Sequence, residues 1–191
     1  FKYRRLSNDS YKDGIITEEK INYLLEMRAS GRDRCEDYAD KFGVPFYKGQ
    51  KPWGVKVDIV MPCATQNEIG IKEAKQIIAN GTKYYIEVAN MPTTEDALNY
   101  LMGMDGVIVA PSKAVNAGGV CVSGLEMSQN SQRLSWTAQE VDEKLHNAMI
   151  NIHKHSVEAA EKYGLGYDLV AGANIAGFEK VAEAMMAQGI Y

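Results

Sequence analysis

The chain has 191 residues, of which 46% are hydrophobic and 24% charged, a composition typical of one globular domain with a buried core. Its 21 basic and 25 acidic residues give a net charge of −4 with no basic stripe, so the sequence argues against nucleic-acid binding. The longest apolar runs, such as Val57–Met61, are far too short to cross a membrane.

The cysteine pattern argues against a zinc ribbon or a redox pair. The chain has 3 cysteines, Cys35, Cys63 and Cys121, which lie far apart and form no CxxC motif. This usage, together with the lack of a visible signal peptide, favours a reducing, cytoplasmic compartment. Because the chain begins with Phe1 rather than Met, we expect it to be a segment of a longer protein.

The N-terminal part predicts two helices and a short strand. Thr17 is placed to cap a helix with an apolar stripe made by Ile21, Leu24 and Leu25. A second helix ends at Gly43, and its apolar stripe consists of Cys35, Tyr38, Ala39 and Phe42. Val44–Tyr47 is then expected to form a strand.

Strands and helices alternate through the middle of the chain. Val57–Met61 is β-branched and almost continuously apolar, which predicts a strand buried on both faces and ended by Pro62. Tyr84–Val88 and Val107–Val109 are the next two predicted strands. This alternation predicts right-handed βαβ units, and therefore an α/β fold with a Rossmann-like parallel sheet flanked by helices.

Two helices are predicted between these strands. The first ends at Gly81 and carries Ala74, Ile77 and Ile78. The second is expected to open with Thr93 as its cap, because Asp96 follows three residues later, and it carries Ala97, Leu98 and Leu101.

After Pro111 the sequence predicts a helical C-terminal region that packs on the sheet. Thr137–Glu140 is a capping box, followed at helical spacing by Val141, Leu145, Met149 and Ile152. Gly164–Gly166 breaks this helix. A last helix is expected after Asn174, with one face formed by Phe178, Val181, Ala182 and Met185, and with Met185 and Met186 at the core and its border.

Ligands of doubly wound sheets lie beyond the carboxyl ends of the strands, and three unusual loops occupy that position. In the first, residues 62–67, small and hydrogen-bonding side chains suit a ribose or nicotinamide, unless Thr65 or Asn67 is only a helix cap. In the second, residues 89–94, Asn90 suits a carboxamide or ribose, unless it is only a turn residue ahead of Thr93.

The third loop, residues 110–123, is the richest in glycine. Gly118 and Gly119 let the backbone approach a ligand closely, and a helix that starts there favours a carboxylate at its N-terminus. Ser123 then adds a hydroxyl. The alternative is a glycine-rich loop that is bent for packing.

Other candidate motifs are weaker. His146, His153 and His155 lie in one predicted helix, but no two are four residues apart, so no metal site is predicted. Gly164 and Gly166 follow a helix and not a strand, so they indicate a helix stop, and no GxGxxG motif occurs in the chain. The residues themselves therefore indicate part of a dinucleotide-binding domain with a candidate anion-binding loop.

In order and spacing, these loops resemble the hexameric bacterial type of glutamate dehydrogenase. The motifs that carry the resemblance are PCATQN at 62–67, EVANMPTT at 87–94, APSKAVNAGGV at 110–120 and SGLEMSQN at 123–130. Trp136-Thr137, Leu145-His146 and VAGANIAGF at 170–178 extend it, so that it runs from about Gly14 to Tyr191.

The resemblance implies that residues 1–191 are the C-terminal part of a nucleotide-binding domain, including its C-terminal helices, without the N-terminal substrate and oligomerisation domain. It implies a homohexameric parent that interconverts L-glutamate with 2-oxoglutarate and ammonia, using NAD or NADP. It places Cys63, Ala64, Thr65 and Asn90 along the nicotinamide. It also places Asn116 and Val120 at the border of the substrate pocket, and Ser123 against the side-chain carboxylate of glutamate.

The sequence departs from the family pattern in two respects. The family's catalytic lysine and aspartate, and its glycine-rich phosphate loop, belong before residue 1, so no catalytic residue is assigned and the segment alone is expected to be inactive. Phe1–Asp13 does not fit the pattern, and neither Asp9 nor Asp13 is assigned to a ribose.

Two rival functions stay open. A leucine or phenylalanine dehydrogenase of the same superfamily is the first, although a polar Ser123 suits a carboxylate side chain better than an apolar one. A non-catalytic nucleotide-binding fragment is the second.

Overall fold

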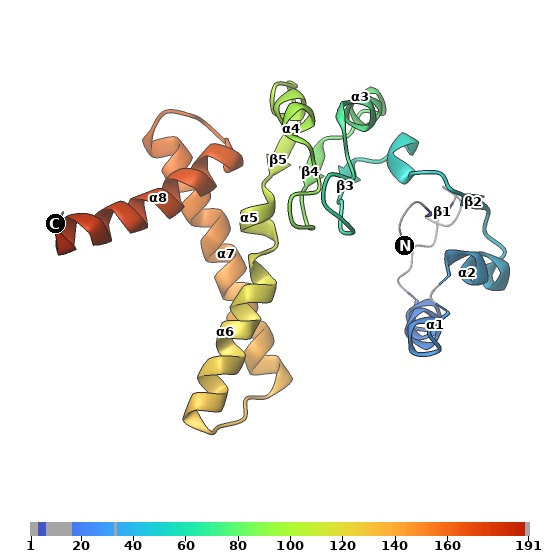
Figure 1. Cartoon of the computed structure of the whole chain (residues 1–191), viewed down its shortest axis with the longest axis horizontal. Helices are drawn as coiled ribbons and strands as arrows, with labels where there is room; N and C mark the ends of the chain where they lie inside the picture. The colour runs from blue at the N-terminus through green and yellow to red at the C-terminus, as the bar shows by residue number, and fades with distance from the viewer. Residues whose placement is uncertain (1–3, 7–16, 33, 190–191) are drawn as a thin grey trace.

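A computed structural model describes residues 4–6, 17–32 and 34–189, and shows the predicted α/β architecture (Figure 1). Asp9 and Asp13 lie outside the described residues. A parallel sheet occupies the middle of the molecule, and the C-terminal region is helical. In the described residues, no helix combines the length and the apolar character needed to cross a membrane.

The central sheet consists of three parallel strands in the order β3-β4-β5. Their bounds are Ile59–Val60 for β3, Tyr84–Ile86 for β4 and Ile108–Ala110 for β5. Helices α3, Ile71–Ala79, and α4, Glu95–Met102, connect them in turn. The two predicted βαβ units are therefore confirmed, although β3 and β4 are shorter than predicted and β5 lies one residue later in the chain.

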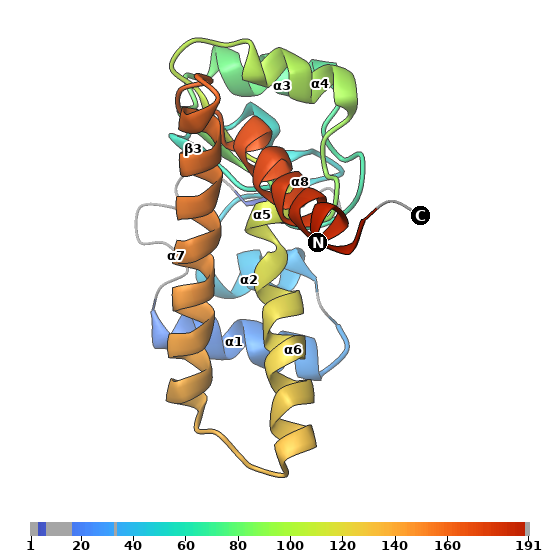
Figure 2. The same ribbon diagram turned by 90° about the vertical axis from the view of Figure 1, so that its left-hand side faces the viewer.

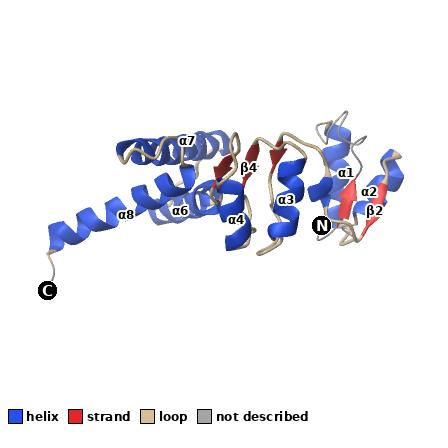
Figure 3. Cartoon of the chain, turned by 90° about the horizontal axis from the view of Figure 1, so that it is seen from above, coloured by secondary structure: helices blue, strands red, loops and turns tan. Residues whose placement is uncertain are grey.

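The core lies on one face of this sheet, between the strands and helices α3 and α4 (Figure 3). The inward strand residues share one register, in which Val60 pairs with Tyr85 and Tyr85 with Val109. They meet the helix side chains Ala74, Ile77, Ala97 and Leu101. This burial of apolar side chains is the main favourable contribution to the stability of the sheet.

The prediction that Val57–Met61 is buried on both faces is wrong. Ile59 and Met61 are each 51% exposed, and Tyr84 beside Ile59 is 42% exposed. Successive side chains of a strand point to opposite faces, and α3 and α4 cover only the face that carries Val60. The described chain leaves much of the second face open at β3 and β4.

The N-terminal part forms a helical pair beside a small antiparallel ribbon. Helix α1, Glu18–Ala29, starts at Thr17, whose side chain accepts the N–H of Lys20 at 3.4 Å. Leu25 is 61% exposed, and Met27 is the residue that α1 buries. Helix α2, Cys35–Phe42, ends at Gly43 with φ of 62°, as predicted.

The observed strand begins two residues later and ends one residue later than the predicted strand Val44–Tyr47. Strand β2 is Phe46–Lys48 and pairs with β1, Arg4–Leu6, in antiparallel fashion. A short 3-10 helix, η2 at Pro52–Gly54, then leads into the parallel sheet.

Four helices follow β5. They are α5, Ser112–Val115; α6, Ala117–Gln132; α7, Ala138–Lys162; and α8, Leu169–Gln188. The capping box that starts α7 is confirmed, since Thr137 and Glu140 exchange hydrogen bonds between side chain and backbone. Gly164 and Gly166 both have positive φ and separate α7 from α8, as predicted.

The predicted start of the last helix is wrong. Helix α8 begins before Asn174, because the Asp168 carboxylate accepts the N–H groups of Val170 and Ala171 at 3.0 and 2.9 Å. Its outer half projects away from the sheet (Figure 1). Met185 and Met186 are 56% and 77% exposed, so their predicted place in the core is also wrong for this chain.

Helices α6 and α7 form an antiparallel hairpin that extends from the carboxyl end of β5 (Figures 1 and 2). Helix α8 crosses α7 and reaches β5 with its first turns, where Val170 packs against the core. The helical region is thus joined to the sheet at the start of α5 and of α8, while the rest of the hairpin stands clear.

The crossing of α7 and α8 depends on Gly172. A Cβ atom at this position would lie 1.9 Å from the carbonyl oxygen of Ser156 and 3.2 Å from the Cβ of Ala160. The two backbones are therefore in direct contact, and only glycine fits between them.

We predict that Gly172→Ala destabilises the chain by about 1–3 kcal/mol, because the added methyl group forces α7 and α8 apart. Gly177→Ala is the matched control, since a Cβ there meets nothing within 4 Å. The control is expected to be neutral or to stabilise α8 by up to about 1 kcal/mol. Urea unfolding of both variants measures the difference, and equal stabilities would contradict the close crossing.

Candidate functional site

Three loops meet at the carboxyl edge of the parallel sheet, as the alternation of strands and helices predicted. The loops after β3 and β4 are tied together through the backbone. The carbonyl of Pro62 accepts the N–H groups of Val88 and Ala89 at 3.1 and 2.8 Å, and the N–H of Asn67 donates to the carbonyl of Met91 at 3.0 Å. The two loops therefore form one surface.

Both loops contain a residue in the left-handed region. Asn67 and Met91 each have φ of 52°. Asparagine adopts this conformation readily, whereas for methionine it costs free energy and must be imposed by the surroundings. Buried Pro92 and the hydrogen bond from Asn67 hold Met91 in place. Such conformations are often found at binding sites.

The predicted nicotinamide-side residues lie on this surface. Cys63, Ala64 and Asn90 are exposed, and Thr65 is half-buried. The Cys63 thiol contacts the carbonyl oxygen of Met61 at 3.2 Å. Partial burial, and then the negative charge of Glu68, raise the pKa of Cys63, so the group is a neutral thiol at neutral pH.

The structure removes the alternative that Thr65 or Asn67 caps a helix. Helix α3 has Gly70 at its N-cap, and the carboxylate of Glu73 accepts the N–H of Gly70 at 3.1 Å. The side chains of Thr65 and Asn67 are thus not needed to start α3.

The prediction that Thr93 caps the next helix is also wrong. Thr94 is the N-cap residue of α4, while the side chain of Thr93 points inward and is buried. Its hydroxyl lies 2.6 Å from the hydroxyl of fully buried Tyr85. Burial raises the pKa of Tyr85, so the phenol keeps its proton and this hydrogen bond persists over the neutral range.

Two buried carboxylates lie below the loops and were not predicted. Glu68 and Glu87 are 6% and 4% exposed. The Glu87 carboxylate accepts the backbone N–H of Ser112, at the start of α5, at 3.1 Å. Among the described residues, Oε2 of Glu68 has no hydrogen-bond partner. For Glu87, the sequence signal of burial is its position directly after the apolar strand β4.

The third loop is mostly helical. Helix α6 starts at Ala117, with Asn116 as its N-cap, so the predicted helix start near Gly118 is confirmed. Asn116, Val120 and Ser123 are spaced by four and three residues, which places them on one face of α6. Val120 is 78% exposed and Ser123 is exposed, so this face is open.

The two glycines of this loop have different surroundings. A Cβ on Gly118 would lie 3.3 Å from Leu145 and 3.5 Å from Met149, so packing against α7 accounts for Gly118. A Cβ on Gly119 would meet nothing within 4 Å. The alternative that the loop is glycine-rich for packing therefore explains only one of the two.

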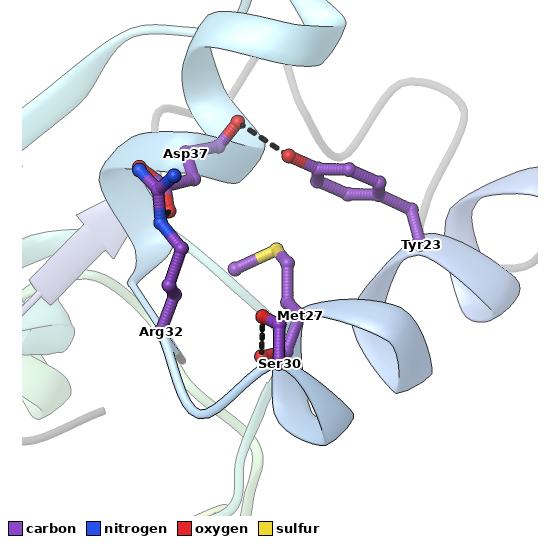
Figure 4. A network of polar contacts seen from close by, with 5 residues as sticks. All are labelled: Tyr23, Met27, Ser30, Arg32 and Asp37. Carbon is purple, nitrogen blue, oxygen red and sulfur yellow. Dashed lines mark hydrogen bonds and ion pairs between the residues drawn. The ribbon is translucent and has the colours of Figure 1, made fainter.

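A hollow of about 620 Å³ lies elsewhere, between α1 and α2 (Figure 4). Several of its polar groups bond to the chain around the hollow itself. Arg32 pairs with Asp37 at 3.1 Å, the Tyr23 hydroxyl donates to the carbonyl of Asp37 at 3.3 Å, and Ser30 donates to Met27 at 2.8 Å. This open hollow is a helix–helix contact, and the three loops are the better candidate site.

Metal chemistry is not indicated in the part of the chain that the structure describes, where no three His, Cys, Asp or Glu side chains gather as ligands. Of the three histidines, His153 is hydrogen-bonded to the hydroxyl of Tyr167 at 2.7 Å.

Comparison with known proteins identifies relatives of the chain in sequence and in structure. The family model for glutamate/leucine/phenylalanine/valine dehydrogenases matches residues 10–189. The NAD-specific glutamate dehydrogenase of Clostridium symbiosum is 71% identical over 178 residues, which are 93% of this chain and 40% of that protein. The NADP-specific glutamate dehydrogenase of Escherichia coli is 52% identical over 175 residues, 92% and 39% of the two chains.

A solved glutamate dehydrogenase superposes with a TM-score of 0.89 at 71% identity, over 93% of this chain and 39% of the other. The chain thus spans about two fifths of the length of the curated relatives that it matches.

We predict that Tyr85→Phe destabilises the chain by about 1–3 kcal/mol, because it leaves the buried Thr93 hydroxyl without its partner. Tyr84→Phe, at the exposed neighbour, is expected to change the stability little. The double variant with Thr93→Val should cost less than the sum of the two single variants. Urea unfolding of the full cycle measures the coupling, and strict additivity would contradict the buried hydrogen bond.

Proposed function

The chain belongs to the glutamate/leucine/phenylalanine/valine dehydrogenase family, and from this membership we propose that it is the C-terminal part of a glutamate dehydrogenase. The whole protein interconverts L-glutamate with 2-oxoglutarate and ammonia. The observation that carries this proposal is the 71% identity to an NAD-specific glutamate dehydrogenase across nearly the whole chain. The three joined loops provide the place where the reactants meet.

The loops after β3 and β4 fit a nicotinamide cofactor. NAD or NADP supplies hydride transfer when it is bound. Asn90 offers an exposed amide that both donates and accepts hydrogen bonds, which suits a carboxamide or a ribose. Thr65 adds a hydroxyl, and small Ala64 beside Cys63 leaves room for a flat ring. The backbone bonds between these loops hold the donors in a fixed arrangement.

The open face of α6 fits glutamate. We assign the Ser123 hydroxyl to the side-chain carboxylate, which it reaches as a hydrogen-bond donor. Val120 lies between Asn116 and Ser123 on the same face and offers an apolar contact for the methylene groups. Ser123 is the residue that favours glutamate over a leucine or phenylalanine type of substrate, for which an apolar side chain would be expected.

The remaining assignments follow the family resemblance. The lysine and aspartate that carry out proton transfer, and the glycine-rich phosphate loop, are proposed to precede residue 1 in the whole protein. That protein is proposed to be a cytoplasmic homohexamer, and the cytoplasmic assignment is in keeping with a cysteine pattern, Cys35, Cys63 and Cys121, that contains no CxxC motif.

The first test compares the isolated chain with a chimera. In the chimera, the matched stretch of this chain replaces the corresponding 178 residues of the Clostridium symbiosum enzyme. We expect no glutamate turnover by the isolated chain, since general acid–base groups alone contribute roughly 10²–10⁴-fold. The chimera should oxidise glutamate with NAD or NADP. A folded but inactive chimera, or an active isolated chain, would contradict the proposal.

The second test changes Ser123 in the chimera. A hydrogen bond to a charged group contributes about 1.5–3 kcal/mol, so Ser123→Ala should lower kcat/KM for glutamate by about ten- to a hundred-fold. The loss should be much smaller for norvaline, which lacks the side-chain carboxylate, and the KM for the nucleotide should hardly change.

Ser128→Ala is the control for this test. Ser128 is exposed on the same helix, but its hydroxyl donates to the carbonyl of Gly124 at 2.9 Å and lies off the Asn116–Ser123 face. This variant should behave as the unsubstituted chimera does. Equal losses for glutamate and norvaline in Ser123→Ala would rule out the carboxylate role.

A further inference from the structure

We propose that Glu87 is a positioning residue, which locks the start of α5 to the end of β4 and thereby fixes the Asn116–Ser123 face relative to the loop that carries Asn90. The inference rests on the proposed function, because it concerns the relative placement of the cofactor and substrate sides of that site.

Glu87 holds the chain on both sides of Pro111. Its backbone N–H donates to the carbonyl of Ala110 at 3.0 Å, and its carboxylate accepts the N–H of Ser112 at 3.1 Å. Pro111 itself is buried. The two bonds therefore clamp the three residues through which β5 passes into α5.

The carboxylate is suited to this task because it is buried and its bond is charge-assisted. Glu87 is 4% exposed, and among the described residues it has no ion-pair partner. The N–H of Ser112, as the first residue of a helix, has no partner within the helix. A buried carboxylate and an unpaired helix N–H thus satisfy each other across 25 residues of sequence.

A change in the direction of the chain at Ser112 moves the Asn116–Ser123 face, because α5 leads directly into α6. Asn116 is both the C-cap of α5 and the N-cap of α6, so the two helices follow each other without a linker. Ser123 lies eleven residues beyond Ser112, up to about 17 Å at 1.5 Å per helical residue. A tilt of about 10° at Ser112 then moves Ser123 by up to about 3 Å, and a displacement of 1 Å is enough to cost about a hundred-fold in rate.

The far part of this segment has its own supports, so the clamp acts mainly on position. Lys113 is hydrogen-bonded through Nζ to Oδ1 of Asn174 on α8, and Gly118 packs closely on Leu145 and Met149 of α7. Loss of the Glu87 carboxylate is therefore expected to free the start of α5 while the α6–α7 hairpin persists.

The test uses the chimera with Glu87→Ala, Glu87→Asp and Glu87→Gln. Alanine removes the acceptor, aspartate keeps the charge but is one methylene too short, and glutamine keeps an acceptor oxygen at full length. Glu73→Ala is the matched control, since Glu73 also accepts a helix-start N–H, from Gly70 at 3.1 Å, and pairs with Lys51 at 3.0 Å. Its helix, α3, does not lead to the substrate face.

We expect Glu87→Ala to raise the KM for glutamate by about ten-fold or more, with the nucleotide KM nearly unchanged. Glu87→Asp should also raise the KM for glutamate more than the KM for the nucleotide, but by a smaller factor. Glu87→Gln should restore most of the affinity for glutamate. Glu73→Ala should lower the melting temperature without a split between the two KM values. Equal changes in both KM values, or no rescue by glutamine, would overturn the proposal.

Amide hydrogen exchange keeps this test separate from the proposed function. Exchange at the Ser112 N–H should become faster in Glu87→Asp and Glu87→Ala, and not in Glu73→Ala, whether or not the chimera turns over glutamate. Unchanged exchange at Ser112 overturns the clamp even if Glu87→Ala fails to fold, because Glu87→Asp carries the same comparison. An inactive chimera with faster exchange at Ser112 contradicts only the proposed function.

Discussion

The carbonyl of Pro62, which accepts two backbone N–H groups from the loop after β4, is the contact on which the rest of the site depends. It continues the parallel pairing of β3 and β4 beyond the strands and brings the loops 62–67 and 89–94 into one surface. The hydrogen bond between Asn67 and Met91 in these loops also holds Met91 in the left-handed region, which is costly for methionine. Buried Tyr85, bonded to Thr93, supports the surface from below.

Beyond β5 the chain forms a helical arm, α5 to α8, which is stabilised differently from the sheet. The arm is joined to the sheet at the start of α5, by Glu87, and at the start of α8, by the packing of Val170. Between these points its stability is internal, from the close crossing of α7 and α8 at Gly172 and from the contact of α6 with α7. The loops after β3 and β4 are thus joined to each other near both of their ends, whereas α6 is held at one end and along one side.

Local signals in the sequence predicted most elements, and contacts distant in sequence account for most of the errors. The Thr137–Glu140 box and the apolar spacing of α3 and α4 involve neighbouring residues, and both are confirmed. The spacing of Thr93 and Asp96 predicts a cap, but the partner of Thr93 is buried Tyr85, which is not a helix neighbour. No local pattern marks Glu87, because its partner Ser112 lies 25 residues away. Asp168 is the exception, since it is an ordinary local cap that starts α8 before the predicted Asn174.

Under the proposed function, the arrangement of α6 separates substrate specificity from stability. Gly118 faces Leu145 and Met149, so the packed side of the helix allows little change. Val120 and Ser123 lie on the open side, where both side chains are exposed in the described chain. Such a helix can present a hydroxyl to a carboxylate, or an apolar group to an apolar side chain, on one unchanged scaffold. This separation fits a family whose shared model covers glutamate, leucine, phenylalanine and valine dehydrogenases. Because this face itself makes few contacts, the position of α6 depends on contacts elsewhere, namely the packing of Gly118 on α7 and the Glu87–Ser112 hydrogen bond where α5 leaves the sheet.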